Sequence, residues 1–496
     1  MMKVYLDEIY AGKDVRKNLI SLRQELKTEE KRRQFAYLLR GDFQIFLDLL
    51  KNEDPKVRKN AALILGDMET EEVLPFLFSA YQKENTLFIR SDYLRAMQKL
   101  DYRFYVEKLK NRLETLWSME LTEENRKHVR EETVQLQSMI LKYEKPKKHI
   151  FTGYEPAPEV ILVTNRHQTA AVREQVTTGK VTELPQGLRI KNGNLRELVN
   201  IRLYTELLFL LPGSRPISGT PREIGESLAK LGVADFLERL HKKGGCFYYR
   251  MEVKGAMPLE KKGVFIRRVS EALDALCDGR MRNNAAEYEA ELRLLQRKDG
   301  SFTPMIKLFT LPDHRFDYRK EVIASSISPV NAALTVWLAR NYLKENAQIL
   351  DPFCGVGTML LERNKLVPAD PMYGVDLFGE AIEKARQNTK RDGSIVHYIN
   401  RDFFDFTHGY LFDEMITDMP RNMGVKGSGD MEMLYQRFFA RAPQYLKDGA
   451  VMVLYTMEPD LVRKTISGSG EYEKLEEFLI NEKHPTFVFV LRVRKL

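Results

Sequence analysis

Four aspartates stand at or just after the ends of four successive short apolar runs in the last third of the chain. Asp351 follows Gln348-Ile-Leu350, Asp376 closes Tyr373-Gly-Val375, Asp402 comes shortly after Val396-His-Tyr-Ile399, and Asp418 ends Glu414-Met-Ile-Thr417. A single aspartate in such a place is usually a helix N-cap or a loop residue. Because the carboxyl ends of parallel strands meet at one edge of a sheet, four in register predict carboxylates gathered around one polar ligand.

The residues that begin at the first aspartate form a glycine turn. Asp351-Pro-Phe-Cys-Gly-Val-Gly-Thr358 leads into the helix-like Met359-Leu-Leu-Glu-Arg363. A strand that turns through glycines into a helix presents backbone N–H groups to a nucleotide-type ligand. A dinucleotide fold needs a third glycine, but Thr358 and Met359 follow Gly357, which argues against NAD. An ordinary tight turn remains the alternative explanation.

Three of the aspartates can be matched to parts of a nucleotide. Asp376 lies 19 residues after Gly357, where a carboxylate can accept hydrogen bonds from both ribose hydroxyls. Asp402 can accept a hydrogen bond from an adenine amino group while Phe403 packs on the ring. Asp418 is expected to point into the pocket above the sheet.

An α/β domain over residues 311–496 must position these side chains. Strand-like runs alternate with helices at residues 348–350, 372–375, 396–399, 414–417, 450–455 and 487–493. This alternation predicts a Rossmann-like parallel sheet covered by helices. Residues 150–310 mix short β-like runs with amphipathic helices, which predicts an α+β domain. A charged linker with a proline precedes it at residues 143–149.

Residues 1–142 read as helix after helix. Residues 52–66 align with residues 84–97 at a period of 32, which places Val57-Arg58 over Ile89-Arg90. This register resembles HEAT-type repeats, an α-solenoid in which each helix pair buries its apolar stripe against its neighbours. We expect either a platform for a protein partner or RNA, or a helical cap on the next domain.

Charge and cysteine content narrow the class of protein. The net charge is +8, and residues 141–320 carry 32 Lys and Arg against 22 Asp and Glu. This basic segment suits a polyanion such as RNA, with scattered solvated lysines as the alternative. The three cysteines are far apart, so we expect no disulfide framework and no metal site. Neither a run of about 18 apolar residues nor a signal-peptide core occurs, so we expect no membrane contact and a cytoplasmic location.

The motifs resemble those of class I S-adenosylmethionine-dependent methyltransferases. The matching segments are the glycine turn, Gly374-Val-Asp376 with Ala381 and Asn388 downstream, and Asp418-Met-Pro420. Phe316-Asp-Tyr-Arg319 and Ser328-Pro-Val-Asn-Ala-Ala333 are similar to the lead-in of THUMP-domain RNA methyltransferases that modify guanine N2. Residues 187–205 resemble, more weakly, the ferredoxin-like part that accompanies THUMP. The helical N-terminus has no counterpart in this resemblance.

The resemblance implies S-adenosyl-L-methionine as the cofactor and RNA, either tRNA or rRNA, as the substrate. The cofactor would be bound by Asp351, Phe353, Cys354, Gly355, Gly357, Thr358, Asp376, Leu377, Asp402 and Phe403. Catalysis would involve Asp418, Met419, Pro420 and Arg421, and the substrate would contact Tyr318, Arg319 and Ser328. A carboxylate and a backbone carbonyl at Asp418-Met-Pro can accept both N–H bonds of a weakly nucleophilic exocyclic amine and orient it for transfer.

Arg421 departs from the motif of the resembled family, which usually has an aromatic residue here that stacks on the flipped base. A guanidinium can also stack on a base, or it can bind phosphate. The leading hypothesis is therefore an RNA methyltransferase acting at guanine N2. The alternatives are an RNA-binding or scaffolding protein with impaired turnover, and an amino-methyltransferase for adenine N6 or a protein.

Overall fold

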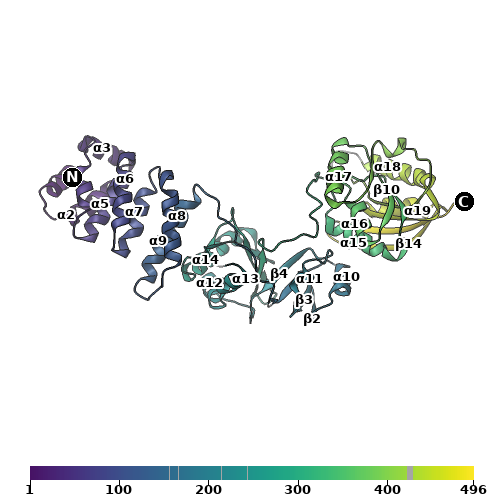
Figure 1. Cartoon of the computed structure of the whole chain (residues 1–496), viewed down its shortest axis with the longest axis horizontal. Helices are drawn as coiled ribbons and strands as arrows, with labels where there is room; N and C mark the ends of the chain where they lie inside the picture. Colours follow the sequence, from purple (N-terminus) through teal and green to yellow (C-terminus); the bar gives the residue numbers. More distant parts are fainter. Residues whose placement is uncertain (156, 166, 214, 243, 422–427, 496) are drawn as a thin grey trace. The chain divides into compact units, whose positions relative to one another are not determined.

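The computed structural model describes residues 1–155, 157–165, 167–213, 215–242, 244–421 and 428–495 (Figure 1). They form two compact units, each built from two segments of the chain. The first unit joins Met1–Phe151 to Gly213–Pro304, and the second joins Thr152–Pro212 to Met305–Leu496. The predicted middle domain, residues 150–310, is thus divided between the two units. Within the described ranges no helix is both long and apolar enough to cross a bilayer.

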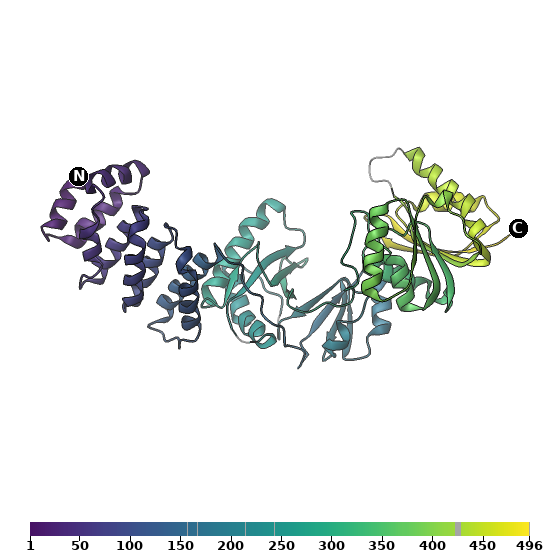
Figure 2. The same ribbon diagram turned by 45° about the horizontal axis from the view of Figure 1, so that its top comes forward.

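The N-terminal part of the first unit is a stack of helices, as expected (Figure 2). The helices are α1 (Met2–Tyr10), α2 (Val15–Glu25), α3 (Glu29–Leu39), α4 (Gln44–Leu49), α5 (Pro55–Asp67), α6 (Leu74–Lys83), α7 (Leu87–Met97), α8 (Val106–Trp117) and α9 (Arg126–Leu141), with 3₁₀ turns η1 (Glu71–Val73) and η2 (Arg103–Tyr105). Helix α5 packs on α2 and α7, and α7 packs on α6 and α9. Each helix thus buries its apolar stripe mainly against neighbours in the stack.

The predicted repeat shapes the contact between α5 and α7. Asp54 caps α5 by accepting the Lys56 N–H at 2.8 Å, and Pro55 occupies the first turn, where its missing N–H costs nothing. The repeat-equivalent residues Val57 and Ile89 are both buried. A Cβ at Gly66 would stand 2.6 Å from the Ala96 Cα, so the two helices approach too closely for any larger residue.

A buried ionic cluster centred on Glu132 links helices α6 to α9. Its Oε1 accepts hydrogen bonds from Tyr81 Oη at 2.6 Å, Arg90 Nε at 2.9 Å and Arg112 Nε at 2.9 Å. Burial acts to raise the pKa of Glu132, but the hydrogen bond from Arg112 and the charge of Arg90 outweigh it and lower the pKa. One carboxylate on α9 therefore connects three other helices.

The rest of the first unit combines helices with strands. Its elements are α12 (Pro221–Lys230), α13 (Val233–Leu240), β5 (Phe247–Lys254), α14 (Leu259–Leu276), β6 (Met281–Asn283), β7 (Ala290–Gln296) and the start of β8 (Phe302–Leu308). Strand β5 pairs in parallel with β6 and β7, and α14 packs on α12. Gln137 Nε2 donates to Gly279 O at 3.0 Å, and Arg282 Nη1 donates to Val134 O at 2.9 Å. These bonds attach helix α9 to this part of the unit.

The second unit begins with an antiparallel sheet. Strand β1 (Val160–Val163) pairs with β3 (Gly187–Lys191) and β4 (Glu206–Leu210), and β2 (Lys180–Leu184) pairs with β3. The later part of β8 pairs with β4. Two short helices, α10 (Gln168–Gln175) and α11 (Leu195–Leu198), accompany these strands. Strands and helices are thus mixed as expected, while the ferredoxin-like or THUMP-like identity of this region stays a prediction.

A seven-stranded sheet in the order β11-β10-β9-β12-β13-β15-β14 forms the core of the second unit. The strands are β9 (Ala347–Asp351), β10 (Ala369–Asp376), β11 (His397–Asn400), β12 (Phe412–Asp418), β13 (Leu446–Thr456), β14 (Tyr472–Asn481) and β15 (Thr486–Val493). The helices are α15 (Pro329–Ala339), α16 (Thr358–Leu366), α17 (Gly379–Asp392), α18 (Ser428–Arg441) and α19 (Pro459–Ser467), with 3₁₀ turns η3 (Arg340–Tyr342), η4 (Phe403–Asp405) and η5 (Ala442–Tyr445). The five strands β9 to β13 are parallel, and β14 and β15 run antiparallel to their neighbours. The expected α/β class is confirmed.

The sequence pattern located six of these seven strands and missed β14. Four charged residues, Glu473, Lys474, Glu476 and Glu477, interrupt its apolar pattern. The strand lies at one edge of the sheet, where charged side chains reach solvent and discourage pairing with another chain.

Candidate active site

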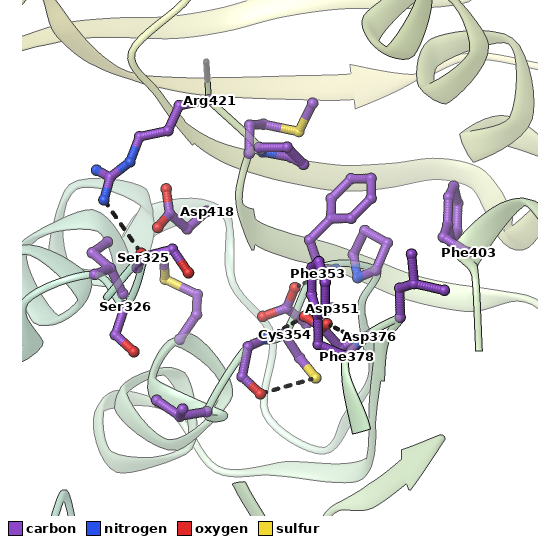
Figure 3. A pocket seen from close by; sticks show the side chains of 18 of the residues that line it. Ser325, Ser326, Asp351, Phe353, Cys354, Asp376, Phe378, Phe403, Asp418 and Arg421 are labelled. Carbon is purple, nitrogen blue, oxygen red and sulfur yellow. Dashed lines mark hydrogen bonds between the residues drawn. The ribbon is translucent and has the colours of Figure 1, made fainter. Parts of the chain in front are cut away.

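The four aspartates lie around one cavity of about 520 Å³ in the second unit. Figure 3 labels three of them, Asp351, Asp376 and Asp418. Asp351, Asp376 and Asp418 are the last residues of β9, β10 and β12, and Asp402 follows β11. Because these strands are parallel, their carboxyl ends share one edge of the sheet. The lining also includes Ile323, Ser325, Ser326, Ile327, Pro352, Phe353, Cys354, Gly355, Val356, Thr358, Met359, Leu377, Phe378, Phe403, Phe404, Met419, Pro420, Arg421, Met431, Leu434 and Arg437.

The two glycines of the turn have different tasks. Both have positive φ, +52° at Gly355 and +81° at Gly357. A Cβ at Gly355 would meet no atom within 4 Å, whereas a Cβ at Gly357 would stand 2.1 Å from the Tyr398 Oη. Gly355 lines the cavity, while Gly357 caps helix α16 and makes room for Tyr398. The sequence pattern located the strand that carries Tyr398 but not the role of this residue.

Asp376 ties the end of β10 to the glycine turn. Its Oδ2 accepts the Gly355 N–H at 2.8 Å, and its Oδ1 accepts the Phe378 N–H at 2.9 Å. Each carboxylate oxygen can accept a second hydrogen bond, so the group retains capacity for a ligand. Beside it, Leu377 and Phe378 line the cavity and remain 59% and 67% exposed, which offers an apolar surface next to the carboxylate.

Asp402 and the two phenylalanines after it form another part of the cavity wall. The Asp402 Oδ1 accepts the Phe404 N–H at 3.0 Å and caps η4. The Phe403 ring is only 2% exposed and packs edge-on against Phe353, with ring centroids 5.9 Å apart. Phe404 lies under the guanidinium of Arg437 at 4.0 Å. Phe403 therefore serves mainly as core, and Phe404 with Arg437 forms a stacked pair at the cavity that the sequence did not reveal.

Two of the aspartates have strongly raised pKa values. Burial raises the pKa of Asp351 to about 8, and the charges of Asp376 and Asp418 add to this. Burial raises the pKa of Asp418 to about 7, although the nearby Arg421 charge opposes the shift. Among the four aspartates Asp418 is the one whose carboxylate accepts no hydrogen bond from any described residue. A half-buried carboxylate at a cavity that is left without donors favours a ligand that supplies N–H groups.

The residues after Asp418 are fixed by the neighbouring strand and helix. The Met419 N–H donates to Tyr455 O at 2.8 Å, and Pro420 O accepts from Tyr435 Oη at 3.2 Å. Arg421 contacts Met457 Sδ at 3.3 Å and Ser325 O at 3.4 Å, two weak partners for a guanidinium (Figure 3). Within the described residues most of its donors are therefore left for a ligand.

The three predicted substrate contacts do not line the cavity. Tyr318 is buried and its Oη donates to Glu362 at 2.6 Å. Arg319 Nε contacts Thr358 Oγ1 at 3.3 Å, and its Nη2 donates to Ile327 O at 2.8 Å. Ser328 caps α15 by accepting the Asn331 N–H at 3.2 Å. Arg319 thus links Ile327 to Thr358 at the end of the glycine turn, and the segment 323–327 supplies lining residues that the sequence pattern missed.

The residues of the cavity fit S-adenosylmethionine. The volume of the cavity is in the range of small-molecule sites, and the cavity lining combines an exposed apolar patch with carboxylates at the strand ends. The carboxylates of Asp376 and Asp402 stand in the same lining as the two arginines Arg421 and Arg437, so the cavity offers both acceptors and donors to a ligand. The open Gly355 side of the turn provides close backbone approach.

Comparison with known proteins supports the same class. Residues 317–484 match the family of RMKL-like methyltransferase domains, and residues 43–118 match HEAT repeats. A tRNA (guanine(10)-N2)-dimethyltransferase from Methanothermobacter thermautotrophicus is 29% identical over 131 residues. That alignment spans 26% of this chain and 38% of the relative.

Solved structures share the fold. TrmN from Thermus thermophilus matches with a TM-score of 0.52 and 19% identity, covering 68% of this chain and 99% of that protein. A predicted N6-adenine-specific DNA methylase from Listeria monocytogenes matches with a TM-score of 0.50 and 14% identity, covering 67% and 95%. The predicted cofactor, S-adenosyl-L-methionine, is confirmed by the methyltransferase-domain match. Residues 43–118 are thus similar to HEAT repeats, and residues 317–484 are similar to a methyltransferase domain.

Proposed function

We propose that this protein methylates the exocyclic amine N2 of a guanine in RNA, with tRNA as the substrate to test first. The observation that carries the proposal is Asp418, a desolvated carboxylate at the cavity that accepts no hydrogen bond from the described residues. Guanine presents N1–H and N2–H side by side, so one carboxylate can accept both. The aligned relative, named as a tRNA guanine-N2 dimethyltransferase, and the basic residues 141–320 support RNA.

The proposed cofactor-binding residues surround the glycine turn. Asp376 would accept the ribose hydroxyls with the lone pairs that Gly355 and Phe378 leave free. Asp402 and the apolar surface of Leu377 and Phe378 would hold the adenine ring. When bound, S-adenosylmethionine supplies an electrophilic methyl group.

Asp418 would orient the amine and take its proton. The lone pair of an exocyclic amine is delocalised into the ring, so alignment by the carboxylate contributes much of the rate. An acceptor whose pKa lies near 7 can receive the N2 proton and release it to solvent within one turnover. Met419 and Pro420, fixed through Tyr455 and Tyr435, would keep the carboxylate in place.

Arg421 would stack its guanidinium plane on the everted base. Its two contacts, Ser325 O and Met457 Sδ, leave the guanidinium weakly restrained beside Asp418. A planar cation can replace an aromatic ring as a stacking surface.

Arg421 also motivates a second candidate function. Because Arg421 stands where the resembled motif has an aromatic residue, the protein could bind RNA and cofactor without turnover, with the helical repeats recruiting a partner. Adenine N6 or a protein amine are further substrates for a carboxylate of this kind. Cytoplasmic location stays a prediction.

The test is methyl transfer in vitro. Purified protein with labelled S-adenosylmethionine and tRNA from cells lacking the gene should yield labelled N2-methylguanosine. Asp418→Ala should lower kcat by about 10²-fold or more while cofactor affinity stays within a few-fold, since loss of a general base has this size. Cofactor binding without labelled product on any RNA would favour the second candidate, and labelled N6-methyladenosine would replace the guanine assignment.

A further inference from the structure

The first unit contains a second cavity, of about 630 Å³, that the methyltransferase reaction does not use. It lies where the last two helices of the repeat stack meet the linker and the start of β5. Its lining comprises Lys110, Leu113, Glu114, Trp117, Ser118, Gln137, Ile140, Leu141, Glu144, Lys145, Pro146, Lys147, Lys148, His149, Ile150, Lys242, Gly244, Gly245, Cys246 and Tyr248. We call it the junction cavity.

The described lining of the junction cavity is strongly cationic. It includes five lysines against two glutamates. Lys110 pairs with Glu107 and Glu144, and Lys145 pairs with Glu287. Lys147, Lys148 and Lys242 make no ion pair or side-chain hydrogen bond to any described residue. Three unneutralised ammonium groups at a concave surface favour a ligand with several negative charges.

One wall of the junction cavity is aromatic and rigid. The His149 ring stacks on Phe247, with centroids 3.9 Å apart and planes at 18°. The two His149 ring nitrogens lie against the Glu289 carboxylate and the Gly244 carbonyl, which fixes the ring. Trp117, 37% exposed at the end of α8, also lines the cavity.

Gly245 keeps the space between His149 and Trp117 open. Its φ is +88°, a conformation that other residues rarely adopt. A Cβ there would stand 3.3 Å from His149 Nε2 and 3.8 Å from Trp117 Cη2. A side chain at this position would therefore crowd His149 and lie against Trp117.

We propose that the junction cavity binds a nucleotide of the RNA substrate, with a base against Trp117 and its phosphates on Lys147, Lys148 and Lys242. Base stacking on an aromatic ring beside phosphate-binding lysines is the usual chemistry of single-stranded RNA sites. The carboxylate side chains of an acidic peptide would use the lysines, but they cannot stack on Trp117 as a base does. This inference rests on RNA being the substrate, and it gives the last helices of the repeat stack a role in RNA binding.

The test compares matched variants of the full-length protein. The triple variant Lys147→Glu, Lys148→Glu, Lys242→Glu changes exposed side chains and should weaken binding of total tRNA at least 10-fold, with a shallower salt dependence. The control, Lys17→Glu with Lys27→Glu and Lys51→Glu, alters three exposed lysines outside the cavity lining and should bind tRNA within about 2-fold to 3-fold of wild type. Fluorescence anisotropy with labelled tRNA measures both.

Stacking is tested separately from charge. Trp117→Ala should weaken tRNA binding about 5-fold to 50-fold, and Trp117→Phe should restore most of it because a ring remains. In each variant S-adenosylmethionine affinity should stay unchanged, since the methyl-donor cavity lies in the other unit.

The outcomes separate this inference from the proposed function. If wild type methylates tRNA while the lysine and tryptophan variants bind it normally, the junction cavity is not an RNA site and the proposed function stands. If wild type methylates no RNA but binds tRNA through these residues, the junction cavity stands and the proposed function fails. If the triple lysine variant loses binding of a labelled polyglutamate probe while its tRNA binding is unchanged, the junction cavity binds an acidic peptide and the inference is overturned.

Discussion

The Asp376 carboxylate accepts the backbone N–H of Gly355 at 2.8 Å and so joins the end of β10 to the glycine turn after β9. The same carboxylate accepts the Phe378 N–H at 2.9 Å. One side chain therefore sets both the shape of the turn and the position of the exposed Leu377 and Phe378.

Substitution of Asp376 should weaken cofactor binding before it affects chemistry. Asp376→Ala removes a charged acceptor, and we expect S-adenosylmethionine affinity to fall about 30-fold to 100-fold, or about 2–3 kcal/mol. Isothermal titration calorimetry measures this directly. The Asp376→Asn variant keeps one acceptor oxygen, so its S-adenosylmethionine affinity should fall less. Equal affinity of the alanine variant and wild type would remove Asp376 from the ribose site.

Methyl transfer should depend on the ionisation of Asp418. Because burial raises its pKa to about 7, the accepting carboxylate form increases from pH 6 to pH 8. We expect the single-turnover rate constant of methyl transfer, measured at saturating cofactor, to rise through this range and level off above it. The side chain of the Asp418→Asn variant cannot ionise, so its methyl-transfer rate should be low and should not change with pH. A wild-type profile that is flat from pH 6 to 8 would contradict proton acceptance by Asp418.

The positions of the aspartates were predictable because they follow from the order of the strands. Each predicted apolar run is a strand, and three of the four aspartates are the last residue of a strand. The alternation of strands and helices implied parallel strands, which placed these aspartates at one edge of the sheet. The segment 323–327 and Arg437 had no such signal. They reach the cavity through contacts distant in sequence, such as Arg421 Nη2 to Ser325 O at 3.4 Å and the Arg437 guanidinium over the Phe404 ring at 4.0 Å. Residue type alone also could not separate Phe403, which is core, from Phe404, which faces Arg437.

Arg421 should act through the plane of its guanidinium. Arg421→Ala should lower kcat/KM for RNA about 10-fold while S-adenosylmethionine affinity is unchanged. Arg421→Tyr should restore activity because a ring provides the stacking surface, whereas Arg421→Lys should not, since an ammonium has no plane. Steady-state kinetics with tRNA separates these variants. Full rescue by lysine would instead assign Arg421 to phosphate binding.

The helical repeats should depend on Glu132. Glu132→Ala leaves the buried Arg90 and Arg112 without their shared acceptor, and we expect a loss of about 3 kcal/mol in the free energy of unfolding. Urea denaturation followed by circular dichroism measures the change. Glu131→Ala, one residue earlier on α9 and more exposed, is the control and should cost under about 1 kcal/mol. Equal losses in both variants would show that the cluster is not a source of stability.

The central claim is that this protein methylates guanine N2 in RNA. The most direct measurement is mass spectrometry of nucleosides from purified tRNA and rRNA of cells with and without the gene. We expect that one N2-methylguanosine species is lost without the gene, that the wild-type gene restores it, and that the Asp418→Ala gene does not. An unchanged set of methylguanosines in both RNA classes would contradict it.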